Sequence, residues 1–324
     1  MKKIGFVVFG CLFLVFLSFC FAFKKNTVSY PEKPLVSVTI AAYNHEKYIE
    51  ETLLSIINQT YKNIELIIID DGSSDRTFEI IQNTLKKYPN RFVRTDISTQ
   101  KNVGTNETSN RLNKKIKGEF SYALASDDVA YPQAIEKQLN FLLNHPDYVL
   151  VVGDNRFIDE NSNPIKVDFD LNVVTNPKQL SSETFAQRLN IKDNQFNKGL
   201  YNRGLFGDYF TLLGGNHIPN GYLIRRSAAN DIHFTPEAPL EDYYLMLQLS
   251  KKGKLGYIDE VLFSYRRHSK NTASKENKDK MKKIFQKTLE YENWLCIHEP
   301  FRRDYLFKVN MHKLKCKLKH LFLS

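Results

Sequence analysis

The sequence is poor in cysteine, and its few cysteines form no known binding pattern. Four occur among 324 residues, and none belongs to a CxxC pair; they are Cys11, Cys20, Cys296 and Cys316. Zinc ribbons and dithiol redox motifs need closely spaced thiols, so the spacing excludes both. The lack of a disulfide framework favours a reducing compartment. No segment recurs at a fixed period, which excludes the repeat architectures as well.

Signatures of nucleic-acid binding are also missing, although the net charge is +10. We find no helix-turn-helix, zinc finger or aromatic RNA-binding motif. The basic excess gathers toward the C-terminal end, where lysines alternate with leucines over residues 313–321. Such a segment is either a solvated face or an amphipathic surface for an anionic membrane. We therefore expect a membrane partner and no nucleic acid.

One long hydrophobic run is present, at Ile4–Phe23, with a pair of lysines on each side and no charge inside. About 20 apolar residues suffice to span a bilayer. A cleaved signal peptide is the alternative, but phenylalanines crowd the region where cleavage needs small residues. We predict an N-terminal membrane anchor or signal segment at 1–25, of undecided orientation, and a polar linker at 26–34.

Strands alternate with helices through the first half of the chain. Apolar runs rich in β-branched residues predict strands at Leu35–Ile40, Ile64–Ile69, Phe92–Thr95 and Ser121–Leu124. Segments with helical spacing of apolar residues lie between them. The alternation predicts an α/β protein with a mostly parallel, doubly wound sheet. In the second half, residues 243–252 have the pattern of an amphipathic helix.

Adjacent acids follow two of the predicted strands. Asp70-Asp71 ends one strand and Asp127-Asp128 ends another. Ligands of open α/β sheets bind outside the carboxyl ends of the strands, where carboxylates and substrate phosphates can hold Mg²⁺ together. The plainer alternative is a loop capped by Asp and Ser side chains. Two such pairs in one unit favour a metal that contacts a diphosphate.

Further charged groups in the second half have two interpretations each. Glu241-Asp242 precedes a helix, where acids are common because they complement the helix dipole. Asp242 becomes a candidate general base only if the fold brings it near Asp128. His268 is a surface histidine or, beside two carboxylates, a ligand for a divalent metal. The arginines before it, Arg266 and Arg267, are a solvated pair or phosphate contacts.

With these residues placed, the chain resembles a family 2 glycosyltransferase with the GT-A fold. The resemblance covers roughly 34–274, and several ordered blocks are more specific than a single motif. The blocks are Val36–Asn44, Ser55–Tyr61, Glu65–Asp75, the residues Asn102, Gly104, Asn110 and Gly118, and then Glu241-Asp242, Gly253, Ile258–Leu262 and Tyr265–His268 with Asn271.

The resemblance implies a binding site for a nucleotide-sugar donor. Ala41 and Tyr43 would border the nucleotide, and Asp71 would accept a hydrogen bond from a uracil N–H. Asp127 and Asp128 would bind the ribose and Mn²⁺ or Mg²⁺, and which of the two ligates the metal is open.

The resemblance also implies that Asp242 is the catalytic base and that His268 approaches the metal, as a histidine does in some members. One position departs from the family pattern. Many members have an acid at the place of Ala125, which gives Asp-x-Asp, whereas this chain keeps only the pair Asp127-Asp128.

These implications define an expected domain organisation. The glycosyltransferase domain would span 35–274, with a nucleotide-binding half at 35–155 and an acceptor half at 156–274. A basic helical tail would follow at 275–324. The catalytic domain would face the cytoplasm at a bacterial inner membrane, where nucleotide sugars are available.

The expected reaction is an inverting, metal-assisted transfer from a UDP-sugar to a hydroxyl of a surface glycan or lipid-linked acceptor. The alternatives are a metal-dependent polysaccharide hydrolase or deacetylase and a non-catalytic glycan- or nucleotide-binding relative. The first would work without a nucleotide sugar, and the second would bind nucleotide without releasing UDP.

Overall fold

The computed structural model describes residues 33–192, 209–213, 218–271 and 277–298. The chain divides into two units, Met1–Glu32 and Lys33–Ser324, and everything below concerns the second. The predicted anchor, most of the linker and the end of the predicted tail lie outside the described residues. Among the helices that are described, none is long and apolar enough to span a bilayer.

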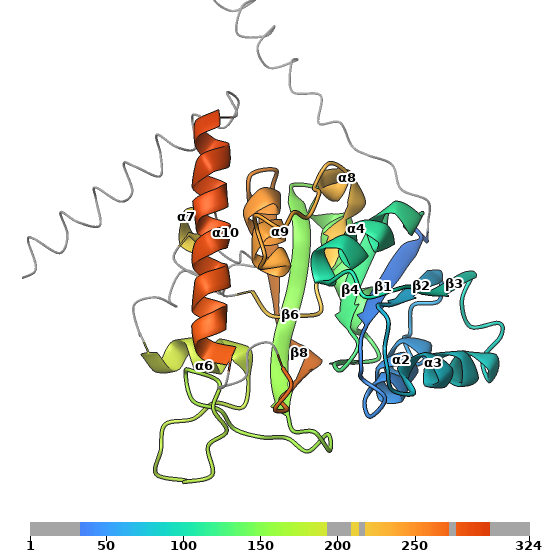
Figure 1. Cartoon of the computed structure of the whole chain (residues 1–324), viewed down its shortest axis with the longest axis horizontal. Helices are drawn as coiled ribbons and strands as arrows, with labels where there is room; N and C mark the ends of the chain where they lie inside the picture. The colour runs from blue at the N-terminus through green and yellow to red at the C-terminus, as the bar shows by residue number, and fades with distance from the viewer. Residues whose placement is uncertain (1–32, 193–208, 214–217, 272–276, 299–324) are drawn as a thin grey trace, which may run out of the picture. The chain divides into compact units, whose positions relative to one another are not determined.

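The described part of the chain forms one mixed eight-stranded sheet with helices packed on it (Figure 1). The strands are β1 (Val36–Ala42), β2 (Ile64–Asp70), β3 (Arg94–Thr99), β4 (Phe120–Ala125), β5 (Val129–Ala130), β6 (Tyr148–Ile158), β7 (Leu223–Arg225) and β8 (Lys254–Arg266). The helices are α2 (Ile49–Ile57), α3 (Thr77–Lys86), α4 (Thr105–Lys115), α5 (Ala134–Asn144), α6 (Phe185–Lys192), α7 (Tyr209–Leu212), α8 (Arg226–Ala229), α9 (Glu241–Ser250) and α10 (Lys278–His298).

The strand order is β3-β2-β1-β4-β7-β6-β8-β5. The first four strands pair in parallel, as the alternation of strands and helices predicted. Beyond β4 the expectation of a mostly parallel sheet holds only in part: β6 and β8 pair in parallel. In contrast, β7 pairs antiparallel to both β4 and β6, and β5 pairs antiparallel to β8. These two strands are three and two residues long, too short to show a period in the sequence.

The apolar pattern places the core as expected. β2 is buried along its whole length, and the α2 residues Ile49, Leu53 and Ile56, spaced for one helical face, are 0% exposed. β3 is the exception, since it runs from Arg94 to Thr99 rather than over Phe92–Thr95. This edge strand is half-exposed and has no apolar run to define it.

α9 differs from the predicted amphipathic helix, because every residue from Tyr243 to Leu249 is buried. Its outer side is covered by α10, which lies beside it in Figure 1. The ring of Tyr243 stacks on Phe285 of α10 with centroids 4.7 Å apart.

A buried ion pair also joins the two helices. Lys251 follows α9 and meets Glu292 of α10, and these side chains are 7% and 0% exposed. Tyr209 of α7 donates a hydrogen bond of 2.7 Å to the same carboxylate. A buried charge is tolerated only with such partners, so α10 is an integral part of this unit.

Candidate functional site

The carboxyl ends of β1, β2 and β4 meet at one edge of the sheet. Register pairs Ala42 with Asp70 across β1 and β2, and Ala41 with Ala125 across β1 and β4. The acid pairs that follow β2 and β4 therefore lie at the same edge, as the sequence predicted for parallel strands.

Asp71 fixes the loop that leads into α4. One of its carboxylate oxygens accepts the Val103 N–H at 3.0 Å and the other accepts the Gly104 N–H at 2.9 Å. Gly104 has a φ of +86°, a conformation that favours glycine. Tyr43, 48% exposed, lies at the same edge, so an aromatic ring and a fixed carboxylate are available to a planar, hydrogen-bonding ligand.

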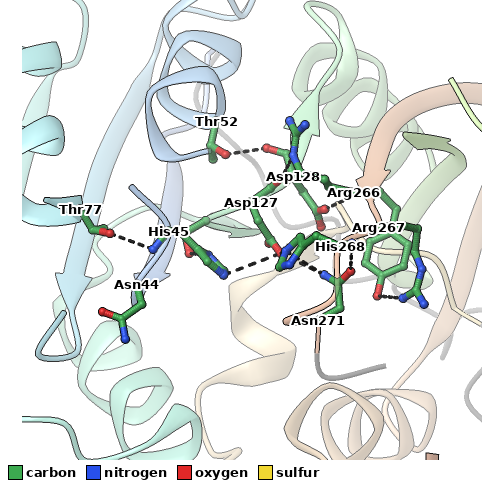
Figure 2. Close-up of polar contacts among 12 residues, drawn as sticks. Asn44, His45, Thr52, Thr77, Asp127, Asp128, Arg266, Arg267, His268 and Asn271 are labelled. Atoms are coloured by element: carbon green, nitrogen blue, oxygen red, sulfur yellow. Dashed lines mark hydrogen bonds and ion pairs between the residues drawn. The ribbon is translucent and has the colours of Figure 1, made fainter. Parts of the chain in front are cut away.

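Asp127 is the centre of a polar cluster (Figure 2). Its Oδ2 lies 2.9 Å from His268 Nε2, 3.2 Å from Asn271 Nδ2 and 4.0 Å from His45 Nε2. The side chains come from the turn after β4, the segment after β8 and the turn after β1. The structure thus brings together Asp127 and His268, two of the residues that the family resemblance assigns to the metal.

His45 completes this cluster, and the sequence interpretation missed it. His45, Asp127 and His268 each offer one ligand atom, and these atoms lie within 4.8 Å of one another. The Nδ1 of His45 is 2.7 Å from Ser126 Oγ, which orients the ring. Its backbone lies directly after Asn44, whose φ of +51° bends the chain at the end of β1. The only feature of the sequence that could have indicated this role is the position of His45 just after the end of the first predicted strand.

Burial is the main cause that lowers the pKa of His45, partly opposed by the charge of Asp127. The imidazole is therefore neutral at pH 7, as a metal ligand must be. Two imidazole nitrogens and one carboxylate are a donor set that suits Mn²⁺ or a similar divalent ion, and nearby Asn271 supports the carboxylate.

Asp128 has a different role from Asp127. It is fully buried, and its Oδ1 accepts the Arg266 backbone N–H at 2.9 Å while its Oδ2 faces Asn220 Nδ2 at 3.5 Å. Its own carbonyl accepts the Thr52 hydroxyl at 2.8 Å. Burial, followed by the charge of Asp127, raises the pKa of Asp128 well above its ordinary value. These contacts tie the turn after β4 to β8.

Arg266 is neither the solvated residue nor the phosphate contact considered from the sequence. It is 1% exposed, and its Nε donates to the Asp127 carbonyl at 2.7 Å. Its terminal nitrogens reach Glu51 at 2.6 Å and Ser162 at 2.8 Å. The donors of the guanidinium are thus already paired within the protein, where they hold the backbone next to the Asp127 cluster.

The third acid pair begins α9. The Leu240 N–H, just before it, donates to Thr288 of α10 at 3.1 Å, so α10 helps to hold this turn. Burial, then the charge of Asp242, raises the pKa of Glu241 to about 7. The negative charge of Asp242 opposes the ionisation of Glu241, which therefore keeps its proton to a higher pH than a free glutamate.

Two segments connect this acid pair to the other acids. Burial raises the pKa of Tyr222, with Asp242 as the next cause, so its phenol lies within electrostatic reach of that carboxylate; Tyr222 is two residues after Asn220, which faces Asp128. On the other side, Asn106 of α4 donates to the Ala238 carbonyl at 3.3 Å, and α4 begins at the loop that Asp71 fixes.

Glu241 gives a pH-dependent prediction for stability. Folding raises the pKa of the Glu241 carboxyl from 4.5 to about 7. The free energy of unfolding of the protein therefore falls as the pH rises from about 4.5 to about 7. Glu241→Gln should therefore be more stable than the parent by up to about 3 kcal/mol at pH 8 and indistinguishable from it at pH 4. Urea titrations at the two pH values measure this, with the exposed Glu183→Gln as control. An equal difference at both pH values would contradict the assignment.

Comparisons with known proteins agree with this geometry. The sequence profile described as "Glycosyl transferase family 2" matches residues 37–210. A Haemophilus influenzae protein named "Uncharacterized glycosyltransferase" is 33% identical over 238 residues, which are 73% of this chain and 78% of that protein. Chondroitin synthase of Escherichia coli is 28% identical over 254 residues, 78% of this chain and 32% of that enzyme.

Two solved structures share the fold. S. aureus TarS 1-349 in complex with UDP-GlcNAc gives a TM-score of 0.53 at 17% identity, with 82% of this chain and 73% of that chain covered. The mannosyltransferase PcManGT from Pyrobaculum calidifontis, in complex with GDP-Man and Mn²⁺, gives 0.50 at 15% identity, with 79% and 65% covered. At these identities the likeness shows a GT-A-like fold.

Proposed function

The chain belongs to glycosyl transferase family 2 and is a glycosyltransferase, and from that premise we propose that it moves a sugar from a UDP-linked donor to an acceptor hydroxyl with inversion. The observation that carries the proposal is the cluster of His45, Asp127 and His268. It lies at the strand edge that also holds Asp71 and Tyr43, where the nucleotide of the donor would bind.

The structural neighbours support a nucleotide-sugar donor, and TarS favours UDP as its nucleotide. TarS was solved with UDP and with UDP-GlcNAc, and PcManGT with GDP-Man. In this chain Ala41 and Tyr43 would border the nucleotide. Asp71 Oδ1 already accepts the Val103 N–H and the Gln100 side-chain amide, and Oδ2 accepts the Gly104 N–H. The remaining lone pair of Oδ2 would accept the uracil N–H.

Asp127, His268 and His45 would hold Mn²⁺ or Mg²⁺. The mixed nitrogen and oxygen donors favour Mn²⁺, since Mg²⁺ prefers oxygen alone. When bound, the metal supplies positive charge that stabilises the leaving diphosphate. Ala125 removes one carboxylate from the usual family pattern, and His45 offers a nitrogen donor at the same edge.

Asp242 would act as the general base. In a single displacement the acceptor oxygen forms a bond to the anomeric carbon, the bond from that carbon to the diphosphate oxygen breaks, and the acceptor proton passes to Asp242. The raised pKa of Glu241 lets that neighbour keep its proton to a higher pH than a free glutamate would.

The acceptor and the location are extensions of the proposal. A surface glycan or a lipid-linked glycan would supply the hydroxyl, and the apolar run at 4–23 would hold the enzyme at a bacterial inner membrane. The catalytic unit would lie on the cytoplasmic side, where nucleotide sugars are made.

A nucleotide-release assay tests the proposed function. The full chain is incubated with Mn²⁺ and a panel of UDP- and GDP-sugars, and free nucleoside diphosphate is measured with and without EDTA. We expect release of UDP from at least one donor and its loss with EDTA. Binding of UDP without release from any donor, in the presence of a glycan acceptor mixture, would indicate a non-catalytic relative. Cleavage or deacetylation of polysaccharide without nucleotide sugar would indicate the hydrolase alternative.

A further inference from the structure

The outward side of α10 carries a stripe of basic and apolar side chains. Lys280, Lys283, Lys287, Trp294 and Ile297 are all exposed. Their offsets of 3, 7, 14 and 17 residues from the first place them on one face of the helix, because a helix repeats every 3.6 residues. We call these five residues the α10 face.

The α10 face contributes little to holding the unit together. Among the described residues, its one hydrogen bond outside α10 is that of the Lys287 ammonium, which donates to the Pro236 carbonyl at 3.3 Å. The residues that pack inward lie on the opposite side of the helix. Thr288 and Glu292 are 0% exposed, and Leu295 and Cys296 are 4% and 2% exposed. The orientation of α10 is therefore fixed by its inner side, and the outer face is presented to the surroundings.

Two large apolar side chains stand in this outer face. Trp294 is 50% exposed and Ile297 is 52% exposed. The Trp294 ring lies between Tyr291 and His298, with centroid distances of 5.9 and 4.5 Å, which extends the aromatic surface along the helix. Tryptophan with an apolar body and a polar N–H is typical of residues that sit at a lipid headgroup boundary.

The charges around these side chains favour an anionic partner. On the exposed part of α10 the lysines Lys280, Lys282, Lys283 and Lys287 outnumber the acids Asp279 and Glu290. The sequence that follows His298 adds seven Lys and Arg residues against two acids over 299–324. The lysines occupy the N-terminal part of the α10 face and the exposed tryptophan and isoleucine its C-terminal part, with Glu290 between them. Basic and apolar side chains on one helix face are the amphipathic pattern of surfaces that lie on anionic lipid.

We propose that the α10 face docks on an anionic lipid bilayer. The docking itself is independent of the chemistry, whereas its use, to present the site to a lipid-linked acceptor, rests on the proposed function. The position of α10 suits that use. Asn277, at its start, donates to the Asn271 carbonyl at 3.1 Å, and Asn271 contacts Asp127. A helix of 21 residues spans about 30 Å, so a docked α10 keeps the Asp127 cluster close to the membrane surface.

The chain provides its own reporter for this surface, since Trp294 is its only tryptophan. Tryptophan emission of the full chain is recorded with vesicles of phosphatidylglycerol and phosphatidylcholine, and with phosphatidylcholine alone, each with a brominated lipid as quencher. We expect a shift to shorter wavelength and quenching with the anionic vesicles only. The signal reports on α10 even if other segments of the chain also bind lipid.

A charge variant supplies the matched comparison. Lys280→Gln, Lys283→Gln and Lys287→Gln combined should raise the anionic lipid concentration needed for the emission shift by roughly a hundredfold. The control combines Lys86→Gln, Lys114→Gln and Lys117→Gln, three exposed lysines outside α10, and should bind as the parent does. Circular dichroism melting checks that both variants fold.

Four results would overturn the proposal. Two are an equal emission shift with both vesicle types and an equal effect of the two triple variants. The others are an emission shift that depends on protein concentration without vesicles, which would indicate a second copy of the chain, and a shift with DNA but none with lipid. The nucleotide-release assay in the absence of lipid is run in parallel. A normal emission shift without UDP release would support lipid docking of the α10 face and contradict the proposed function. UDP release without an emission shift would support the proposed function and contradict the docking.

Discussion

Replacing Asp242 with asparagine is expected to lower kcat by roughly 10²- to 10⁴-fold, the usual contribution of a general base. The amide keeps the size of the side chain and its place in the first turn of α9, but it cannot accept the acceptor proton. Binding of UDP and Mn²⁺ should stay close to that of the parent, because the residues proposed to bind them, Asp71 and Asp127, follow β2 and β4 and are not changed. Initial rates of UDP release give kcat, and calorimetry gives the affinity for UDP.

The control for this variant is Asp231→Asn, which removes a carboxylate that is 75% exposed. It should retain full turnover. If Asp242→Asn also turned over at the parental rate, Asp242 would have no part in proton transfer, and Glu241 would become the acid to test next.

Asp127→Asn is expected to weaken Mn²⁺ binding by at least about 100-fold, because supporting contacts to a metal ligand are already worth 10- to 100-fold. Asp127 is the one anionic member of the cluster, and its Oδ2 faces both His268 and His45. His45→Ala, which leaves the carboxylate in place, should weaken Mn²⁺ binding by about tenfold. Electron paramagnetic resonance of Mn²⁺ titrations in the presence of UDP measures both without reference to turnover.

Asp128→Asn distinguishes the two neighbouring acids. Asp128 is buried against the Arg266 backbone and Asn220, and folding raises its pKa. Replacement by the neutral amide should therefore preserve the melting temperature at neutral pH and leave the affinity for Mn²⁺ close to that of the parent. If instead Asp128→Asn abolished Mn²⁺ binding while Asp127→Asn retained it, the assignment of the metal to Asp127 would be reversed.

The first half of the fold was predictable from the sequence, and the reason is local. β1, β2 and α2 carry strong apolar periods, and parallel strands necessarily bring the acids that follow β2 and β4 to one edge. β5 was not predictable, since a strand of two residues has no period, and neither was the antiparallel direction of β7. The buried character of α9 was hidden as well, because it depends on α10, which is far away in the sequence.

The site was predictable in its residue types more than in its geometry. The sequence placed Asp127 and Asp128 together but could not separate them, since side-chain directions within a tight turn depend on contacts with distant residues such as Arg266. His45 was missed because a single histidine in a turn carries no pattern. Its significance comes only from the strand pairing that sets it beside Asp127.

The buried meeting of Lys251 with Glu292 has a consequence for chimeras between relatives. Family-based boundaries would invite exchanging the C-terminal region of one member for that of another near residue 274. Such a graft would separate a cation from the carboxylate that compensates it, and Tyr243 from the ring it stacks on. In this chain α9 and α10 therefore act as one structural block, and a chimera joined between them should be less stable than one joined before α9 or after α10.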